Sequence, residues 1–189
     1  MTRPARPSPP PITAGVACLL LACMGSVGDP LTLPPHSGAP GTTLAAPARA
    51  SYEPVHDVLQ TTCGTLDCHG QVGRNLRLYG GRGLRLRKSD NPADDPTTHE
   101  EYDQSYWSVI GLEPEIMSDV VMDGGARPDR LTLVRKARNM EHHKGGQLFV
   151  AGDDRDRCLT SWLAGALDLV ACKLGKELLR PGAAPVAAP

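Results

Sequence analysis

Residues 63–70 of the 189-residue chain read Cys-Gly-Thr-Leu-Asp-Cys-His-Gly. Four residues separate the two cysteines, and a histidine follows the second one immediately. Two thiols can add to the two vinyl groups of a haem, and the adjacent histidine then lies beneath the iron as an axial ligand. The usual spacing for this chemistry has two residues between the cysteines. The stretch indicates one covalently attached haem c, held by Cys63 and Cys68, with His69 as the proximal ligand.

Two other chemistries can use the same cysteines. Cys63 and Cys68 can form a structural disulfide with each other, because thiols outside the cytosol tend to be oxidised. They can also bind zinc together with His142 or His143, since thiolates and imidazoles suit a tetrahedral zinc site. Both alternatives stay open on the sequence alone.

The remaining cysteines of the predicted domain are Cys158 and Cys172, a possible disulfide pair. If one unbroken helix joined them, their separation would be about 21 Å, far beyond the limit of about 7 Å for a disulfide. Either the helix ends near Asp168 and the chain folds back, or these two cysteines pair with Cys63 and Cys68. The second pairing would tie the first and last helices together and remove covalent haem. The sequence does not choose between the connectivities.

The amino terminus predicts export. Arg3 and Arg6 precede an apolar run over 12–23 that is too short to span a bilayer, which is typical of a signal peptide. The run ends in Leu-Leu-Ala-Cys at 20–23, which resembles the lipobox of bacterial lipoproteins. We therefore predict a signal peptide over 1–22, lipidation of Cys23, and a lipid-anchored protein of the cell envelope, facing the periplasm or at the cell surface. An ordinary secretory peptide cut further on, or an uncleaved anchor, would also fit the run.

Proline is concentrated at the two ends of the chain: of the 18 prolines, ten lie within 1–50 and three within 181–189. Such segments bury too little apolar surface to offset the entropy lost on ordering. We predict a flexible tether over 23–50, one domain over 51–180, and a disordered tail over 181–189. The formal net charge of -1 excludes a nucleic-acid binder that relies on bulk charge. A single apolar run excludes a protein with several membrane spans.

Residue patterns predict a mainly α-helical domain with one short β-hairpin. Apolar spacing predicts a helix over 51–62, and alternating leucines around a glycine-rich turn predict the hairpin over 74–88, with its arginines facing outward. Thr98 and Glu101 form a capping box for a second helix. Asp129 is the predicted cap of a third helix. A last helix is predicted to start at Asp153 or Asp154 and to carry an apolar stripe from Cys158 to Val170.

Four further segments follow the cysteine stretch in a fixed order: Gly-Leu-Arg-Leu at 83–86, Pro-Asp-Arg-Leu-Thr-Leu-Val-Arg-Lys-Ala at 128–137, Glu-His-His-Lys-Gly-Gly at 141–146 and Trp-Leu-Ala-Gly-Ala at 162–166. In this order the domain resembles the planctomycete-type cytochrome c family, here with a Cys-x4-Cys-His variant of the haem motif. The resemblance covers nearly all of 51–170. It implies a small cytochrome c-like helical fold with a distal-ligand loop at 141–146.

The resemblance implies a second axial ligand opposite His69. The family's loop carries either Met-Pro-Pro or a histidine followed by glycines, and this chain has the second form. The implied ligand is His143 or its neighbour His142, with Met140 as a third candidate. Two histidines would give a lower potential than a histidine and a methionine. Only 4% of the residues are aromatic, which is the composition expected if a porphyrin fills part of the core.

These features together predict an exported, membrane-tethered c-type cytochrome that passes single electrons to a redox partner the sequence does not identify. The sequence holds no paired carboxylates in a shared motif, no Ser/His/Asp arrangement and no phosphate-binding glycine loop, so we expect no enzyme. The alternative is a haem-free, disulfide-stapled lipoprotein that acts as a binding or structural module.

Overall fold

The computed structural model describes residues 43–90 and 95–177. The predicted signal peptide, the lipidation site at Cys23, the tether up to residue 42 and the tail over 181–189 lie outside the described residues. Within those ranges the fold is mainly helical, as predicted, with six α-helices and two 3-10 turns. No helix of the described ranges is both long and apolar enough to span a membrane.

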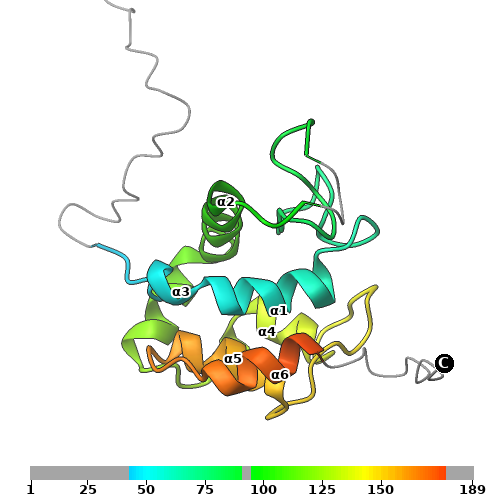
Figure 1. Cartoon of the computed structure of the whole chain (residues 1–189). Coiled ribbons are helices and arrows are strands. Elements are labelled where there is room, and N and C mark those ends of the chain that lie inside the picture. Colours follow the sequence, from blue (N-terminus) through cyan, green and yellow to red (C-terminus); the bar gives the residue numbers. More distant parts are fainter. Residues whose placement is uncertain (1–42, 91–94, 178–189) are drawn as a thin grey trace, which may run out of the picture. The chain divides into compact units, whose positions relative to one another are not determined.

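The first helix, α1 (Glu53–Cys63), forms the centre of the fold. Val55, Val58 and Leu59 are all buried on its inner face. It starts two residues later than predicted, because residues 49–51 form the 3-10 turn η1. Figure 1 shows α1 between α2 on one side and α5 with α6 on the other, and α1 contacts all three.

The second helix, α2 (His99–Ile110), begins where the capping box predicted it. The Glu101 backbone NH donates to Thr98 Oγ1, and the Thr98 backbone NH donates to the Glu101 carboxylate at 2.9 Å. Tyr106 and Val109 are buried on its inner face. This local pairing satisfies two backbone donors that would otherwise lack partners at the helix start.

Two short helices follow. The first, α3 (Pro114–Met122), was not predicted; proline occupies its first turn, and Met117 and Val120 are buried. The prediction that Asp129 caps the next helix is wrong. Asp129 lies within the 3-10 turn η2 (Pro128–Arg130), and α4 (Thr132–Ala137) starts after it. The carboxylate of Glu113 accepts from the Thr132 backbone NH at 2.6 Å, so a distant residue satisfies the start of α4.

The predicted last helix is divided in two. Asp153 caps α5 (Asp154–Leu163) as predicted, and the chain turns over 164–168 before α6 (Leu169–Glu177). The continuous apolar stripe is therefore wrong beyond Leu163, and Val170 is exposed. The turn brings Cys158 and Cys172 into a disulfide with a Cα–Cα distance of 4.6 Å.

The predicted hairpin over 74–88 is not confirmed, since the described residues contain no β-strand there and only an isolated bridge joins Tyr79 and Leu84. Backbone groups that a strand ladder would use are bonded to side chains instead. The Arg77 backbone NH donates to Ser108 Oγ at 2.7 Å, and the Tyr79 backbone NH donates to Ser105 Oγ at 2.9 Å. The segment is thus held against α2 as a loop.

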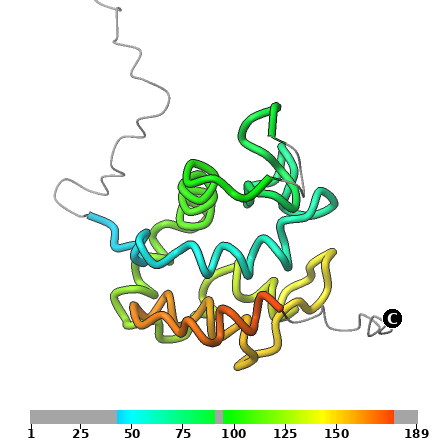
Figure 2. The backbone as a smooth tube through the Cα atoms, viewed as in Figure 1, coloured from blue at the N-terminus to red at the C-terminus, as the bar shows by residue number. Residues whose placement is uncertain are grey.

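Residues 45–48, within the segment predicted as tether, hydrogen-bond to the helical body. The Ala45 backbone NH donates to Ser118 Oγ, Tyr106 Oη donates to the Pro47 carbonyl, and Trp162 Nε1 donates to the Ala48 carbonyl. Figure 2 shows this segment running past α3 directly into α1. The aromatic rings concentrate here: Tyr106 and Trp162 both lie against Tyr52.

Candidate functional site

The cysteine stretch forms a tight turn directly after α1. The His69 backbone NH donates to the Cys63 carbonyl at 2.9 Å, and the backbone NH groups of Cys68 and Gly70 both donate to the Thr65 carbonyl. A Cβ on Gly70 would lie 2.1 Å from the Gly64 carbonyl oxygen, so this position has no room for a side chain. The turn fixes the backbone of His69 relative to the end of α1.

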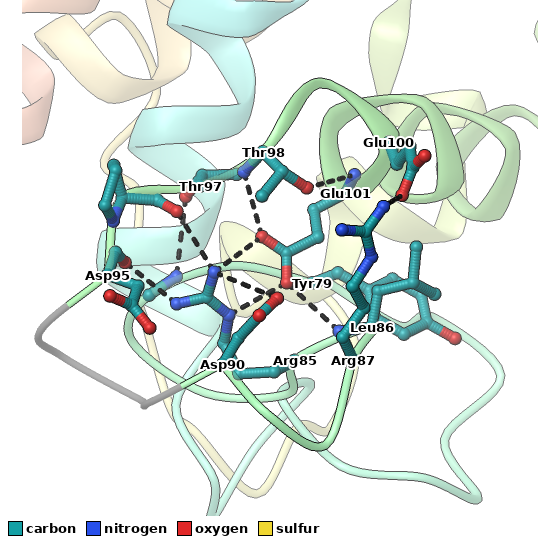
Figure 3. Close-up of polar contacts among 12 residues, drawn as sticks. Tyr79, Arg85, Leu86, Arg87, Asp90, Asp95, Thr97, Thr98, Glu100 and Glu101 are labelled. Atoms are coloured by element: carbon teal, nitrogen blue, oxygen red, sulfur yellow. Dashed lines mark hydrogen bonds and ion pairs between the residues drawn. The ribbon is translucent and has the colours of Figure 1, made fainter.

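The Gly-Leu-Arg-Leu segment packs on this turn. A Cβ on Gly83 would lie 2.0 Å from the Gly64 carbonyl oxygen, so the two backbones are in direct contact. Arg85 is not on a solvated face, as the hairpin prediction implied. Its guanidinium is 4% exposed and pairs at 2.8 Å with the carboxylate of Glu101, which is fully buried (Figure 3). This ion pair holds the segment, and with it the cysteine turn, against α2.

A cavity of about 380 Å³ opens between the cysteine turn and α4. Its apolar wall consists of Leu76, Leu112, Leu133, Ala137 and Leu148. Cys63, His69 and His143 also line it, as do the cationic side chains Arg74 and Lys136. Among the described lining residues there is no carboxylate and no Phe, Tyr or Trp. The cavity therefore suits an apolar ligand that carries anionic groups, and its volume is within the usual range for small-molecule sites.

His69 and His143 both line this cavity, and their rings lie close to each other. Their ring centroids lie 6.1 Å apart and their planes differ by 17°. Nδ1 of His69 is 3.1 Å from the Leu76 carbonyl, which fixes this nitrogen as the protonated donor and leaves Nε2 with its lone pair. Burial lowers the pKa of His69, and His143 and Arg74 lower it further, against the opposing hydrogen bond to Leu76. At neutral pH His69 is thus the neutral imidazole that metals bind.

His143 is held differently. Its Nδ1 is buried and has no hydrogen-bond partner among the described residues. The ring lies against Gly145, where an added Cβ would come within 2.9 Å of His143 Cε1. The His143 carbonyl accepts from the Gly146 backbone NH at 2.9 Å, which closes a turn around the ring. Gly146 has φ of +68°, a conformation that glycine adopts without strain.

The other two candidate ligands face solvent. His142 is exposed, and Met140 is 60% exposed. Of the three residues that the sequence left open, His143 lines the cavity and lies opposite His69, and the other two do not line it.

The four cysteines of the described ranges divide into two kinds. Cys158 and Cys172 are bonded to each other, whereas Cys63 and Cys68 take part in no disulfide. Cys63 is buried and lines the cavity, and Cys68 is half-buried beside His69. A pairing of these four that ties the first and last helices together is therefore absent. The zinc alternative gains no support, because no three His, Cys, Asp or Glu side chains of the described ranges come together as a metal site.

Sequence reasoning missed several cavity residues. The hairpin prediction places Arg74 among a row of outward-facing arginines. Lys136 and Thr132 appear in the sequence analysis only as part of the segment 128–137, with no role of their own. A signal for Lys136 exists, since it lies three residues after Leu133 and one before Ala137 on the same helix. Leu112 follows α2 in a turn that no pattern marks.

No family model matches the chain, and no curated protein or solved structure is significantly similar to it. The motifs and the geometry of this cavity are therefore the evidence for a function.

Proposed function

We propose that this protein is a c-type cytochrome-like electron carrier that holds one covalent haem in the cavity between the cysteine turn and α4. The observation that carries the proposal is the presence of both His69 and His143 in the lining of that cavity, with 6.1 Å between their ring centroids. When bound, the haem would supply a one-electron iron couple. The protein's own residues attach, ligate and enclose it.

The distance between the two rings suits a shared metal ion. A metal bonded to one nitrogen of each imidazole at about 2 Å places the two nitrogens about 4 Å apart and the ring centroids about 6 Å apart. The observed centroid distance of 6.1 Å is of that size, and the two ring planes are stacked at 17° to each other. The buried, unpartnered Nδ1 of His143 is an unsatisfied polar atom in this otherwise well-bonded site. Both rings therefore fit the role of axial ligands.

The rest of the cavity fits a flat apolar group with carboxylates. Its wall is aliphatic, and the rings of Tyr106 and Trp162 lie against Tyr52 instead. Arg74 and Lys136 line the same cavity and suit the propionate groups of a haem. The thiols of Cys63 and Cys68 would each add S–H across a vinyl double bond, with the hydrogen passing to the neighbouring carbon. No oxidant is needed for that step.

The proposal includes export and a lipid anchor at Cys23, followed by the tether, which would place the domain at the cell envelope. The buried disulfide between Cys158 and Cys172 is compatible with an oxidising compartment. Neither the sequence nor the described part of the fold indicates which protein would exchange electrons with this one.

The decisive experiment is expression of the full chain in a bacterial host that matures c-type cytochromes. We expect a Soret band that survives acid-acetone extraction, and an intact mass that includes one haem. The double variant Cys63→Ala, Cys68→Ala should lose the extraction-resistant band. A colourless wild-type protein from that host would overturn the proposal.

The second candidate is a haem-free binding or structural module. It is favoured by the disulfide that clamps α5 to α6, because this clamp stabilises the fold without any cofactor. The same purification separates the two functions, because this module would be colourless, folded and monodisperse, with no haem in its intact mass.

A further inference from the structure

The loop after α4 carries three potential iron ligands within four residues. Met140, His142 and His143 are all side chains that can bind haem iron. Adjacent residues are about 3.8 Å apart, so a slip of the loop by one or three residues would offer a different donor to the cavity. Because all three side chains can bind iron, the conformation of the loop decides which of them faces the cavity.

The two ends of the loop are anchored by the backbone of α4 and its extension. The Met140 backbone NH donates to the Arg135 carbonyl at 2.8 Å, after Asn139 reverses the chain with φ of +57°. At the far end, the backbone NH groups of Leu148 and Phe149 both donate to the Ala137 carbonyl at 2.9 Å. These contacts fix where the loop begins and ends, but not which side chain turns inward.

Between these anchors, Glu141 ties the loop to α4 by its side chain. Its carboxylate lies 3.1 Å from Arg135 Nε and 2.8 Å from Lys136 Nζ. The same Lys136 Nζ donates to the His142 carbonyl at 3.2 Å. Glu141 is thus pinned outside the cavity, at the position between Met140 and His142. With Glu141 held outside, His143 lines the cavity, whereas Met140 and His142 are exposed.

We propose that Glu141 is a positioning residue that selects His143 over Met140 and His142 as the ligand opposite His69. The nature of the bound group rests on the function proposed above, whereas the selection of the inward ring is a property of the chain itself. Glu141 is not among the residues that line the cavity. It acts through Arg135 and Lys136 on the register of the loop.

The test compares Glu141→Ala and Glu141→Gln with Glu100→Gln in the full chain. Glu100 is a matched control, because it forms an equally short 2.8 Å pair with Arg87 on the exposed surface of α2, away from the loop. The first measurement uses haem-free protein: the nuclear Overhauser effect between the His69 and His143 ring protons. We expect a several-fold loss in Glu141→Ala, a smaller loss in Glu141→Gln, and no change in Glu100→Gln.

The second measurement uses haem-loaded protein and electron paramagnetic resonance. Wild type and Glu100→Gln should show one low-spin species, and Glu141→Ala a mixture. The additional species should disappear when Met140→Ala and His142→Ala are added. A Glu141→Ala protein that matches Glu100→Gln in both measurements would overturn the selection role. A colourless wild-type protein would instead contradict the haem proposal. The nuclear Overhauser effect between the two rings would still decide the role of Glu141.

Discussion

The imidazoles of His69 and His143 lie nearly parallel, 6.1 Å apart, yet each is held by its own set of neighbours. The His69 ring is fixed by the Leu76 carbonyl, and the His143 ring by its contact with Gly145. Each ring therefore has a contact of its own that restricts its position.

Replacement of His143 should change the iron ligation without removing the haem. In His143→Ala we expect extraction-resistant haem whose spectrum moves from low spin to high spin, because the second axial ligand is gone. His142→Ala and Met140→Ala should keep the low-spin spectrum, since both side chains are exposed. Optical spectroscopy of the three variants checks this. A low-spin His143→Ala protein would show that another residue is the ligand.

Gly145→Ala should displace the His143 ring while leaving the His143 side chain itself unchanged. The added Cβ would lie 2.9 Å from His143 Cε1, so the ring must shift away from its place opposite His69. We expect a partial conversion to high spin. Gly152→Ala is the control, because its φ of +84° makes an added Cβ strain the backbone while no atom lies within 4 Å of it. Equal spectra for the two variants would contradict the contact with the ring.

The buried ion pair of Arg85 and Glu101 should matter far more for stability than its exposed neighbour. Arg85→Met leaves the Glu101 carboxylate buried and uncompensated, and we expect a loss of about 3–5 kcal/mol in the free energy of unfolding. Arg87→Met breaks the exposed pair with Glu100 and should cost less than about 1 kcal/mol. Urea denaturation measures both. Similar losses would mean that burial of the first pair is not the cause.

The disulfide should contribute strongly to the stability of the last two helices. Closing a loop of this length is worth about 3 kcal/mol in the chain-entropy model. We expect the double variant Cys158→Ala, Cys172→Ala to unfold at a correspondingly lower urea concentration. Added reductant should then change the wild-type midpoint but not that of the variant. A variant as stable as wild type would show that the bond does not form in solution.

Acid should weaken the contact between α1 and α6. Burial would raise the pKa of Asp57, but the side chains of His56, Lys176 and Tyr102 together lower it to about 2. The folded pKa is below the ordinary value near 4, so the stabilisation is present above pH 4 and is lost as the pH falls towards 2. Asp57 is partly exposed, so we expect about 1 kcal/mol after screening is allowed for. Urea curves of wild type and Asp57→Asn at several pH values should converge at low pH.

The parts of the fold that sequence patterns predicted are those governed by neighbouring residues. The capping box of Thr98 and Glu101 and the cap at Asp153 involve partners three residues apart, and both are present. The start of α4 was missed because its partner, Glu113, is distant in the sequence. The hairpin is not confirmed for the same reason: Ser105 and Ser108 of α2 accept the backbone donors of that segment.

The residues of the candidate site have a signal in the sequence, whereas the geometry of the cavity has none. The pattern around Cys63 and the His-His-Lys-Gly-Gly segment point to both histidines through residue type and order alone. Which of His142 and His143 lines the cavity depends on how the loop lies against α4, which a motif does not encode. The burial of Arg85 was equally hidden, since alternation alone placed it on the outer face.

The crowding of aromatic rings around Tyr52 has a practical result for anyone who unfolds this protein. Both tryptophans, Trp107 and Trp162, lie against Tyr106 at that end of the molecule. Intrinsic fluorescence will therefore follow the melting of this end, whereas absorbance of a chromophore beside His69 would follow the other. Coincident transitions from the two probes would demonstrate two-state unfolding. The two tryptophans therefore report on one end of the domain, and the proposed haem would report on the other.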